Sequence, residues 1–327
     1  MDSDGPSRPG SLRTGPHPTA GPGTVRMPRW PGPLLMMSAL VAFASASLDA
    51  SGQMEMDRSF LAPLALVGAI VFVAGLVYAA VRQIRVRSHL PPERYRGPSV
   101  LILIVLVLVI AAAVNAPFGA DATALLLGTG ALTLLGATVI LVSTQLALLL
   151  VSWLFVHRPR ALVGLPSFPG PDAAGALRTG LGWGVIAWIG STIVLAGVVW
   201  ILEQLGQPPE PEVAERAIAM LDPILVVVAI VFLAPIAEEV FFRGVVFNAF
   251  LREGGRRWAF IGSAALFSLI HLSLVSLVPI FLLGLALAWI YDRTGNLLAP
   301  LAMHATVNGI SVALALLVRF DVVRLPV

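Results

Sequence analysis

The stretch SVLILIVLVLVIAAAVNAP, residues 99–117, contains no charged side chain and consists almost entirely of aliphatic residues. A helical run of about 20 apolar residues is long enough to cross the ~30 Å hydrocarbon core of a bilayer. The chain of 327 residues has several such runs, and it is 57% hydrophobic and only 12% charged. Because backbone polar groups must be satisfied internally in a bilayer, these runs predict an all-α, polytopic bundle of transmembrane helices.

We expect about eight or nine membrane spans. The clearer ones are 60–81, 99–117, 134–156, 181–202, 217–237, 258–278, 279–291 and 297–318. A shorter run at 33–48 is either a further first span, which we favour, or a signal-peptide-like element cut near Ala46. Residues 122–133 are also apolar and either lengthen the third span or form a re-entrant piece.

Loop charges orient the predicted bundle. Arginines concentrate in the loops 82–97, 157–164, 252–257 and 292–295, and the loops between them are acidic or neutral. Basic loops stay in the cytoplasm, so the alternation predicts a multi-pass protein of a prokaryotic cell membrane with a cytoplasmic N-terminus. The net charge of +3 has the same explanation, and we expect no nucleic-acid partner.

The composition divides the chain and excludes some chemistry. Residues 1–33 are rich in Pro and Gly and predict a disordered tail. Residues 34–210 hold the N-terminal transmembrane helices, and 211–320 hold most of the ionisable residues found inside spans. Cysteine is absent and every basic residue is arginine, which excludes disulfides, thiolate nucleophiles and a lysine base.

The stretch FLAPIAEEVFFRG, residues 232–244, places three ionisable side chains in an apolar span. Such groups are costly in a bilayer unless partnered, and their default interpretation is functional. Glu239 and Arg243 are four residues apart on one helix face and can neutralise each other. Glu238 is rotated about 100° away. One base cannot compensate two acids, so Glu238 is either protonated or has another partner.

Equal spacing about a turn suggests that partner. Glu238 and His271 lie at equal distances in sequence from the centre of the EGG turn, so two antiparallel helices would bring them to the same depth. From the next turn, His304 and Asn308 lie four residues apart and share a face. We therefore predict that Glu238, His271, His304 and Asn308 converge on one layer that opens toward the cytoplasm.

Each polar residue also has a structural interpretation. A single His or Asn inside a bundle commonly joins helices by a hydrogen bond. The Glu239–Arg243 pair is expected to brace the helix, and Phe267 to pack and to shape the pocket under His271. Asp222 is expected at the interface or at a helix cap. The coincidence of four polar groups at one depth favours a shared site.

Three motifs follow one another in the C-terminal third. EEVFFR (238–243) fits EExxxR, FSLIH (267–271) fits FxxxH, and HATVN (304–308) fits HxxxN. In this order they resemble the CPBP family of intramembrane proteases, also called the ABI or CAAX-protease-like family, which includes the type II CAAX prenyl endopeptidases. The resemblance covers about residues 215–320 and makes 211–320 the expected catalytic domain.

The resemblance implies hydrolysis of a peptide bond by an activated water molecule. It assigns Glu238 as general base, His271 as the group that helps to hold the water, and His304 with Asn308 as donors to the oxyanion. The expected substrate is a membrane-associated or prenyl-type protein or peptide. The site residues encode hydrolysis and leave the substrate and the oligomeric state open.

A metal-dependent mechanism is the alternative to hydrolysis by Glu238 alone. Glu238, His271 and His304 would form a plausible zinc set, and family members are often labelled metalloproteases. Asparagine is a poor zinc ligand, however, and no HExxH motif is present. We therefore expect a glutamate mechanism that requires no cofactor.

Two other function classes would use the same polar cluster. A transporter or proton relay needs buried acids and histidines, and it would be expected to have broken helices in paired repeats, which the sequence lacks. A non-catalytic, immunity-type scaffold would keep the fold alone, and the intact motifs argue against it.

Overall fold

The computed structural model describes residues 58–121, 133–162, 172–207, 209, 213–271 and 273–323, and these residues form helices and turns without strands. The all-α membrane fold is thus confirmed. The predicted tail (1–33), the run at 33–48 and most of 122–133 lie outside the described residues. The boundary near residue 210 stays a prediction.

The described helices are α2 (Arg58–Arg87), α3 (Val100–Asn115), α5 (Leu134–Ser152), α6 (Ala173–Gln204), α7 (Val213–Met220), α8 (Pro223–Val226), α9 (Ala234–Glu239), α10 (Asn248–Gly254), α11 (Arg256–Leu269), α12 (Leu277–Thr294) and α13 (Leu298–Arg319). A 3₁₀ turn, η1 (Ala116–Phe118), follows α3. The wider π-helical segments are η2 (Trp153–His157), η3 (Val227–Leu233) and η4 (Val240–Phe247).

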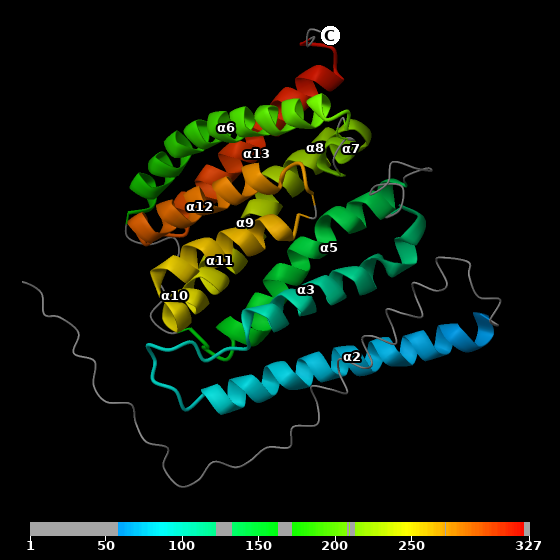
Figure 1. The fold of residues 1–327 in the computed structure, drawn as a ribbon, viewed down its shortest axis with the longest axis vertical. Coiled ribbons are helices and arrows are strands. Elements are labelled where there is room, and N and C mark those ends of the chain that lie inside the picture. The colour runs from blue at the N-terminus through cyan, green and yellow to red at the C-terminus, as the bar shows by residue number, and fades with distance from the viewer. Residues whose placement is uncertain are drawn as a thin grey trace, which may run out of the picture.

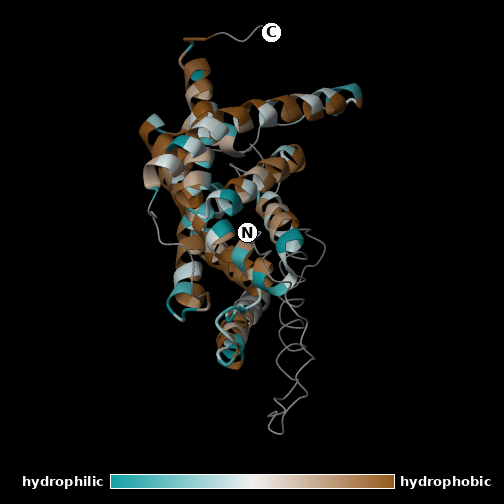
Figure 2. Ribbon diagram, turned by 90° about the vertical axis from the view of Figure 1, so that its left-hand side faces the viewer, coloured by the Kyte–Doolittle hydropathy of each residue, from teal (hydrophilic) through white to brown (hydrophobic). Residues whose placement is uncertain are grey.

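Six stretches of the described chain are long and apolar enough to cross a membrane. They are Val100–Asp121, Leu134–His157, Ala173–Gln204, Pro223–Gly254, Leu277–Thr294 and Leu298–Arg319. The predicted range 60–81 is also helical, within α2. Figure 2 shows apolar ribbon along most of these helices, as a lipid-facing bundle requires. The count of eight or nine spans stays a prediction.

Two predicted spans differ from the structure. The range 217–237 is divided at Leu221–Asp222, where Asp222 caps α8 by accepting hydrogen bonds from two backbone N–H groups. The range 258–278 is wrong as a single span, because α11 ends at Leu269 after 14 residues. His271 therefore lies in the turn beyond the helix rather than inside it.

The helices stack side by side, with α6 and α13 at one side of the bundle, α2 and α3 at the other, and α9 to α11 between them (Figure 1). Glycines allow the closest of these approaches. A Cβ at Gly180 would clash with the carbonyl oxygen of Ala299, and one at Gly184 would lie 2.9 Å from the carbonyl oxygen of Met303. Small residues four apart thus let the backbones of α6 and α13 touch.

The arginine-rich loops meet at one end of the bundle. Arg87, at the end of α2, forms an ion pair with Glu253 at 2.8 Å, which joins the first of these loops to the last turn of α10. The backbone N–H of Arg96 donates to the carbonyl oxygen of Ala161 at 3.0 Å. This hydrogen bond joins the loop after η2 to the loop after α2.

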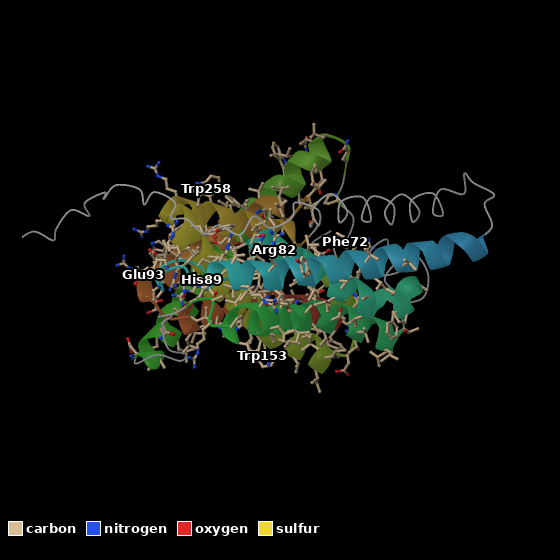
Figure 3. All side chains as sticks on the ribbon, turned by 90° about the horizontal axis from the view of Figure 1, so that it is seen from below. Phe72, Arg82, His89, Glu93, Trp153 and Trp258 are labelled. Atoms are coloured by element: carbon tan, nitrogen blue, oxygen red, sulfur yellow. The ribbon has the colours of Figure 1, made fainter. Side chains whose placement is uncertain are left out.

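The last arginine-rich turn belongs to the same end. Arg256, at the start of α11, pairs with Asp292 near the end of α12. Figure 3 shows His89 and Glu93 at this end together with Trp258. The predicted grouping of the basic loops on one side is confirmed, and their cytoplasmic location stays a prediction.

Candidate active site

The two glutamates of the site lie in a short α-helical piece between π-helical segments. Glu238 and Glu239 end α9, with η3 before it and η4 directly after it. π-Helical turns are rare and occur frequently at functional sites. Side-chain amides bond their carbonyls: Asn308 donates to Ile230 at 2.9 Å, and Asn248 donates to Arg243 at 2.7 Å. The unusual winding is therefore held by partners from within the bundle.

Glu239 is the centre of a buried ionic group. Its side chain is fully buried, and its Oε1 accepts from Arg243 Nη1 at 2.8 Å and from His304 Nδ1 at 2.9 Å. The predicted ion pair between Glu239 and Arg243 is present. Arg243 also donates to the carbonyl oxygen of Gly284 at 3.2 Å, and its guanidinium carbon lies 4.6 Å from the centre of the Phe267 ring. The Arg243 guanidinium is thus held by Coulomb attraction, by hydrogen bonds and by a cation–π contact.

His304 joins the two acids. Its Nδ1 contacts Glu239, and its Nε2 lies 3.8 Å from Oε2 of Glu238. A carboxylate only accepts hydrogen bonds, so Nδ1 carries a hydrogen. The separation of 3.8 Å is longer than a direct hydrogen bond, so this contact is an ion-pair distance only.

The partner of Glu238 differs from the predicted one. The turn-based count pointed to His271, but within the described chain no ion pair joins Glu238 to His271. His304 takes that place, because α13 brings it directly against the end of α9.

His271 lies at the rim. It is exposed, just past the end of α11, and its Nδ1 is 2.7 Å from the carbonyl oxygen of Phe267. The Phe267 ring is buried and makes edge-on contacts with both histidines, with ring centres 5.1 Å from His271 and 5.7 Å from His304. Phe267 therefore packs between the rim and the buried group.

Asn308 is one helical turn beyond His304 on α13. Its contact with Ile230 uses one of the two N–H donors of its amide. The structure thus brings Glu238, Glu239, Arg243 and His304 into one bonded group. His271 and Asn308 are linked to it through Phe267 and through η3, respectively.

A zinc site would require Glu238, His271 and His304 to surround one point. In the part of the chain that the structure describes, no three His, Cys, Asp or Glu side chains are placed to hold a metal ion. Both histidines turn Nδ1 toward an acceptor in the protein, which leaves Nε2 for chemistry. The cofactor-free mechanism stays a prediction.

One polar contact of the site lies outside the three motifs. Gln145 of α5 directs its Nε2 to Oε1 of Glu238, at 3.4 Å. The sequence did contain a signal for it, because Gln145 lies near the middle of the apolar span Leu134–His157. A polar residue at that depth is unusual, and sequence reasoning based on motifs passes over it.

Comparison with known proteins supports the resemblance. Residues 220–310 match the family described as "Type II CAAX prenyl endopeptidase Rce1-like". The predicted resemblance to the CAAX-protease family is thereby confirmed for this region. The matched residues include Glu238, His271, His304 and Asn308, and they exclude α2, α3, α5 and α6.

Individual relatives match over shorter parts. The chain is 32% identical over 123 residues to an "Uncharacterized 24.3 kDa protein" of Escherichia coli, which is 34% of this chain and 55% of the relative. It is 28% identical over 100 residues to the "Putative membrane peptidase YdiL" of Bacillus subtilis, which is 29% of this chain and 41% of that protein.

The chain thus spans about half of the length of these relatives. No solved structure matches. Together with the six apolar stretches, the matches support a multi-pass membrane protein in which residues 220–310 are similar to the type II CAAX prenyl endopeptidases.

Proposed function

We propose, from the premise that residues 220–310 are an Rce1-like region, that this protein is an intramembrane endopeptidase. Its substrate would be a membrane-associated protein or peptide, prenylated or unprenylated. The observation that carries the proposal is the buried group in which His304 bridges Glu238 and Glu239. A structural brace needs only one acid for Arg243, so the second acid and the histidine are left for chemistry.

Glu238 would act as general base. Glu238 is buried, and its Oε2 lies 3.8 Å from the imidazole Nε2, so the water molecule that it activates would lie to one side of the line between these two atoms. Glu238 takes a proton from that water while the water oxygen attacks the carbonyl carbon of the peptide bond. The C–N bond of the tetrahedral intermediate then breaks, and Glu238 returns the proton to the leaving amine, which completes hydrolysis.

His304 would stabilise the charge that moves during this step. When Glu238 accepts the proton, negative charge leaves its carboxylate and develops on the carbonyl oxygen of the substrate. A protonated His304, held by Glu239 and therefore fixed in place, can donate from Nε2 to that oxygen. Asn308 is the second proposed donor, and His271 at the rim would hold the water from the outer side.

The test is cleavage of a peptide library, prenylated and unprenylated, by the purified protein in bicelles. Glu238→Ala is assayed in parallel. Cleavage by the unchanged protein and its loss in the variant are expected. Equal cleavage by both proteins would overturn the mechanism. Absence of cleavage by both, followed by substrate-dependent proton flux in vesicles, would favour the transporter.

Dependence on a metal has its own measurement. We expect cleavage to persist in a strong zinc chelator, and the purified protein to contain less than one zinc ion per chain. Loss of cleavage in chelator, restored by zinc, would instead assign Glu238, His271 and His304 as ligands after rearrangement.

The cytoplasmic orientation is also part of the proposal. Because the chain contains no cysteine, single cysteines can be introduced without background. A cysteine at Glu253 is expected to react with an impermeant thiol reagent only from the cytoplasmic side. Reaction from the outer side would mean that the topology is opposite to the proposed one and that the substrate arrives from the outer side.

A further inference from the structure

The centre of α5 holds a polar side chain that the proposed chemistry does not use. Gln145 lies in the middle of the span Leu134–His157 and outside the family-matched region, residues 220–310. A glutamine at this depth is unfavourable unless it is bonded. Its position therefore calls for a partner within the bundle, and that partner is Glu238.

Through this contact, the two oxygens of the Glu238 carboxylate face two different helices. Gln145 Nε2 lies 3.4 Å from Oε1, and His304 Nε2 lies 3.8 Å from Oε2. The reversed amide would place the Gln145 oxygen against a carboxylate oxygen, so Nε2 is the atom that faces Glu238. One oxygen is thereby held on the α5 side while the other stays beside the histidine.

The other polar atom of the Gln145 amide has no hydrogen-bond partner among the described residues. Its Oε1 is fully buried and accepts no hydrogen bond from any described residue. A buried acceptor left alone is costly. A hydrogen-bond donor that enters the site from outside the chain, either water or the N–H of a bound peptide, would satisfy it.

We propose that Gln145 is a positioning residue for Glu238. Its N–H holds the carboxylate so that Oε2 stays directed at His304, and its Oε1 receives a donor that enters the site. The inference rests on the proposed function for the role of Glu238 as a base. The contact itself does not depend on that function and is tested separately.

The first experiment measures the contact without a substrate. The unfolding equilibria of the full chain, of Gln145→Met, of Glu238→Met and of the double variant form a double-mutant cycle in mixed micelles. Hydrogen bonds inside membrane proteins average about 0.6 kcal/mol, so we expect coupling of about threefold in the unfolding equilibrium constant. Strictly additive effects would overturn the proposal.

The second experiment measures catalysis on a peptide that the unchanged protein cleaves. Gln145→Met is expected to lower kcat by about 10- to 100-fold, because a displaced base is inefficient, and to leave KM within about twofold. Gln145→His, which restores an N–H donor of similar reach, should recover part of kcat. A higher KM with unchanged kcat would overturn the positioning role.

A matched control makes the same change elsewhere. Gln83 of α2 accepts from the backbone N–H of Ser99 at 2.6 Å, away from the site, and Gln83→Met should leave kcat unchanged. An equal loss in both variants would assign the effect to general damage and overturn the proposal. If the unchanged protein cleaves no peptide, the proposed function fails, and the double-mutant cycle still decides the contact.

Discussion

The buried side of the site and its rim are built differently. On the buried side, Glu239, Arg243 and His304 are at most 3% exposed and are joined by hydrogen bonds of 2.8 and 2.9 Å. At the rim, His271 is exposed, and its contacts among the described residues are the carbonyl oxygen of Phe267 and the edge of the Phe267 ring.

The difference separates two tasks. Groups that stabilise developing charge must already be oriented before the reaction, and a buried group joined by short ion pairs provides that. Groups that receive water and substrate must be reachable, and a turn beyond a helix end provides that. Glu238 lies at the boundary, with its side chain 9% exposed.

The largest effect is expected at this boundary. Glu238→Gln keeps the size of the side chain and an acceptor for Gln145, but it removes the base, so kcat should fall by about 10²–10⁴. The measurement is peptide cleavage under single-turnover conditions, with circular dichroism to verify the helical fold. Activity within tenfold of the unchanged protein would place the base elsewhere.

A change on the buried side should affect folding first. Arg243→Met leaves Glu239 buried without its cation, and breaking such a pair costs about 3–5 kcal/mol. Denaturation in micelles measures it. The double variant Arg243→Met, Glu239→Gln should recover much of the loss, because no unpaired charge remains. Arg256→Met is the control, since that side chain is 69% exposed.

A change at the rim should affect catalysis alone. His271→Ala is expected to lower kcat by about 10²-fold, in the range for loss of one oriented polar group, and to leave the unfolding midpoint unchanged. His304→Ala should lower both. His89→Ala, in the exposed loop after α2, is the matched control. A destabilised His271→Ala would show that the rim is as structural as the interior.

The smallest effect is expected at the arginine-rich end. Arg87 and Glu253 form a partly exposed ion pair, and Arg87→Gln should cost less than ~1 kcal/mol in unfolding free energy. The remaining effect should shrink in high salt, because exposed charges are screened. A larger, salt-independent loss would mean that this contact is part of the core of the fold.

Local patterns predicted much of this molecule. Apolar length predicted the helices, and the spacing of four residues predicted the pair of Glu239 with Arg243, because both follow from helix geometry. The partner of Glu238 could not be predicted in this way. Counting from the turn assumed that α11 continues to His271, whereas it ends at Leu269.

Contacts between distant spans were also beyond the sequence. His304 reaches Glu238, and Gln145 reaches it from the opposite side, only because α13 and α5 both pack on α9. Neither pairing leaves a periodic pattern in a single sequence. The roles of the site residues therefore remain predictions, although the structure gathers them.

The short α11 has a consequence for the surrounding lipid. Its 14 residues rise about 21 Å, less than the ~30 Å of a hydrocarbon core. Measured from its arginine-rich start, the helix ends before the far leaflet does. Irregular backbone is tolerated at that depth only where it is buried in protein or lines a water-filled cavity, and His271 is exposed rather than buried. The hydrophobic mismatch would thin the bilayer beside His271. The protein would thus supply its own hydrated defect beside the site at which the proposed hydrolysis consumes water.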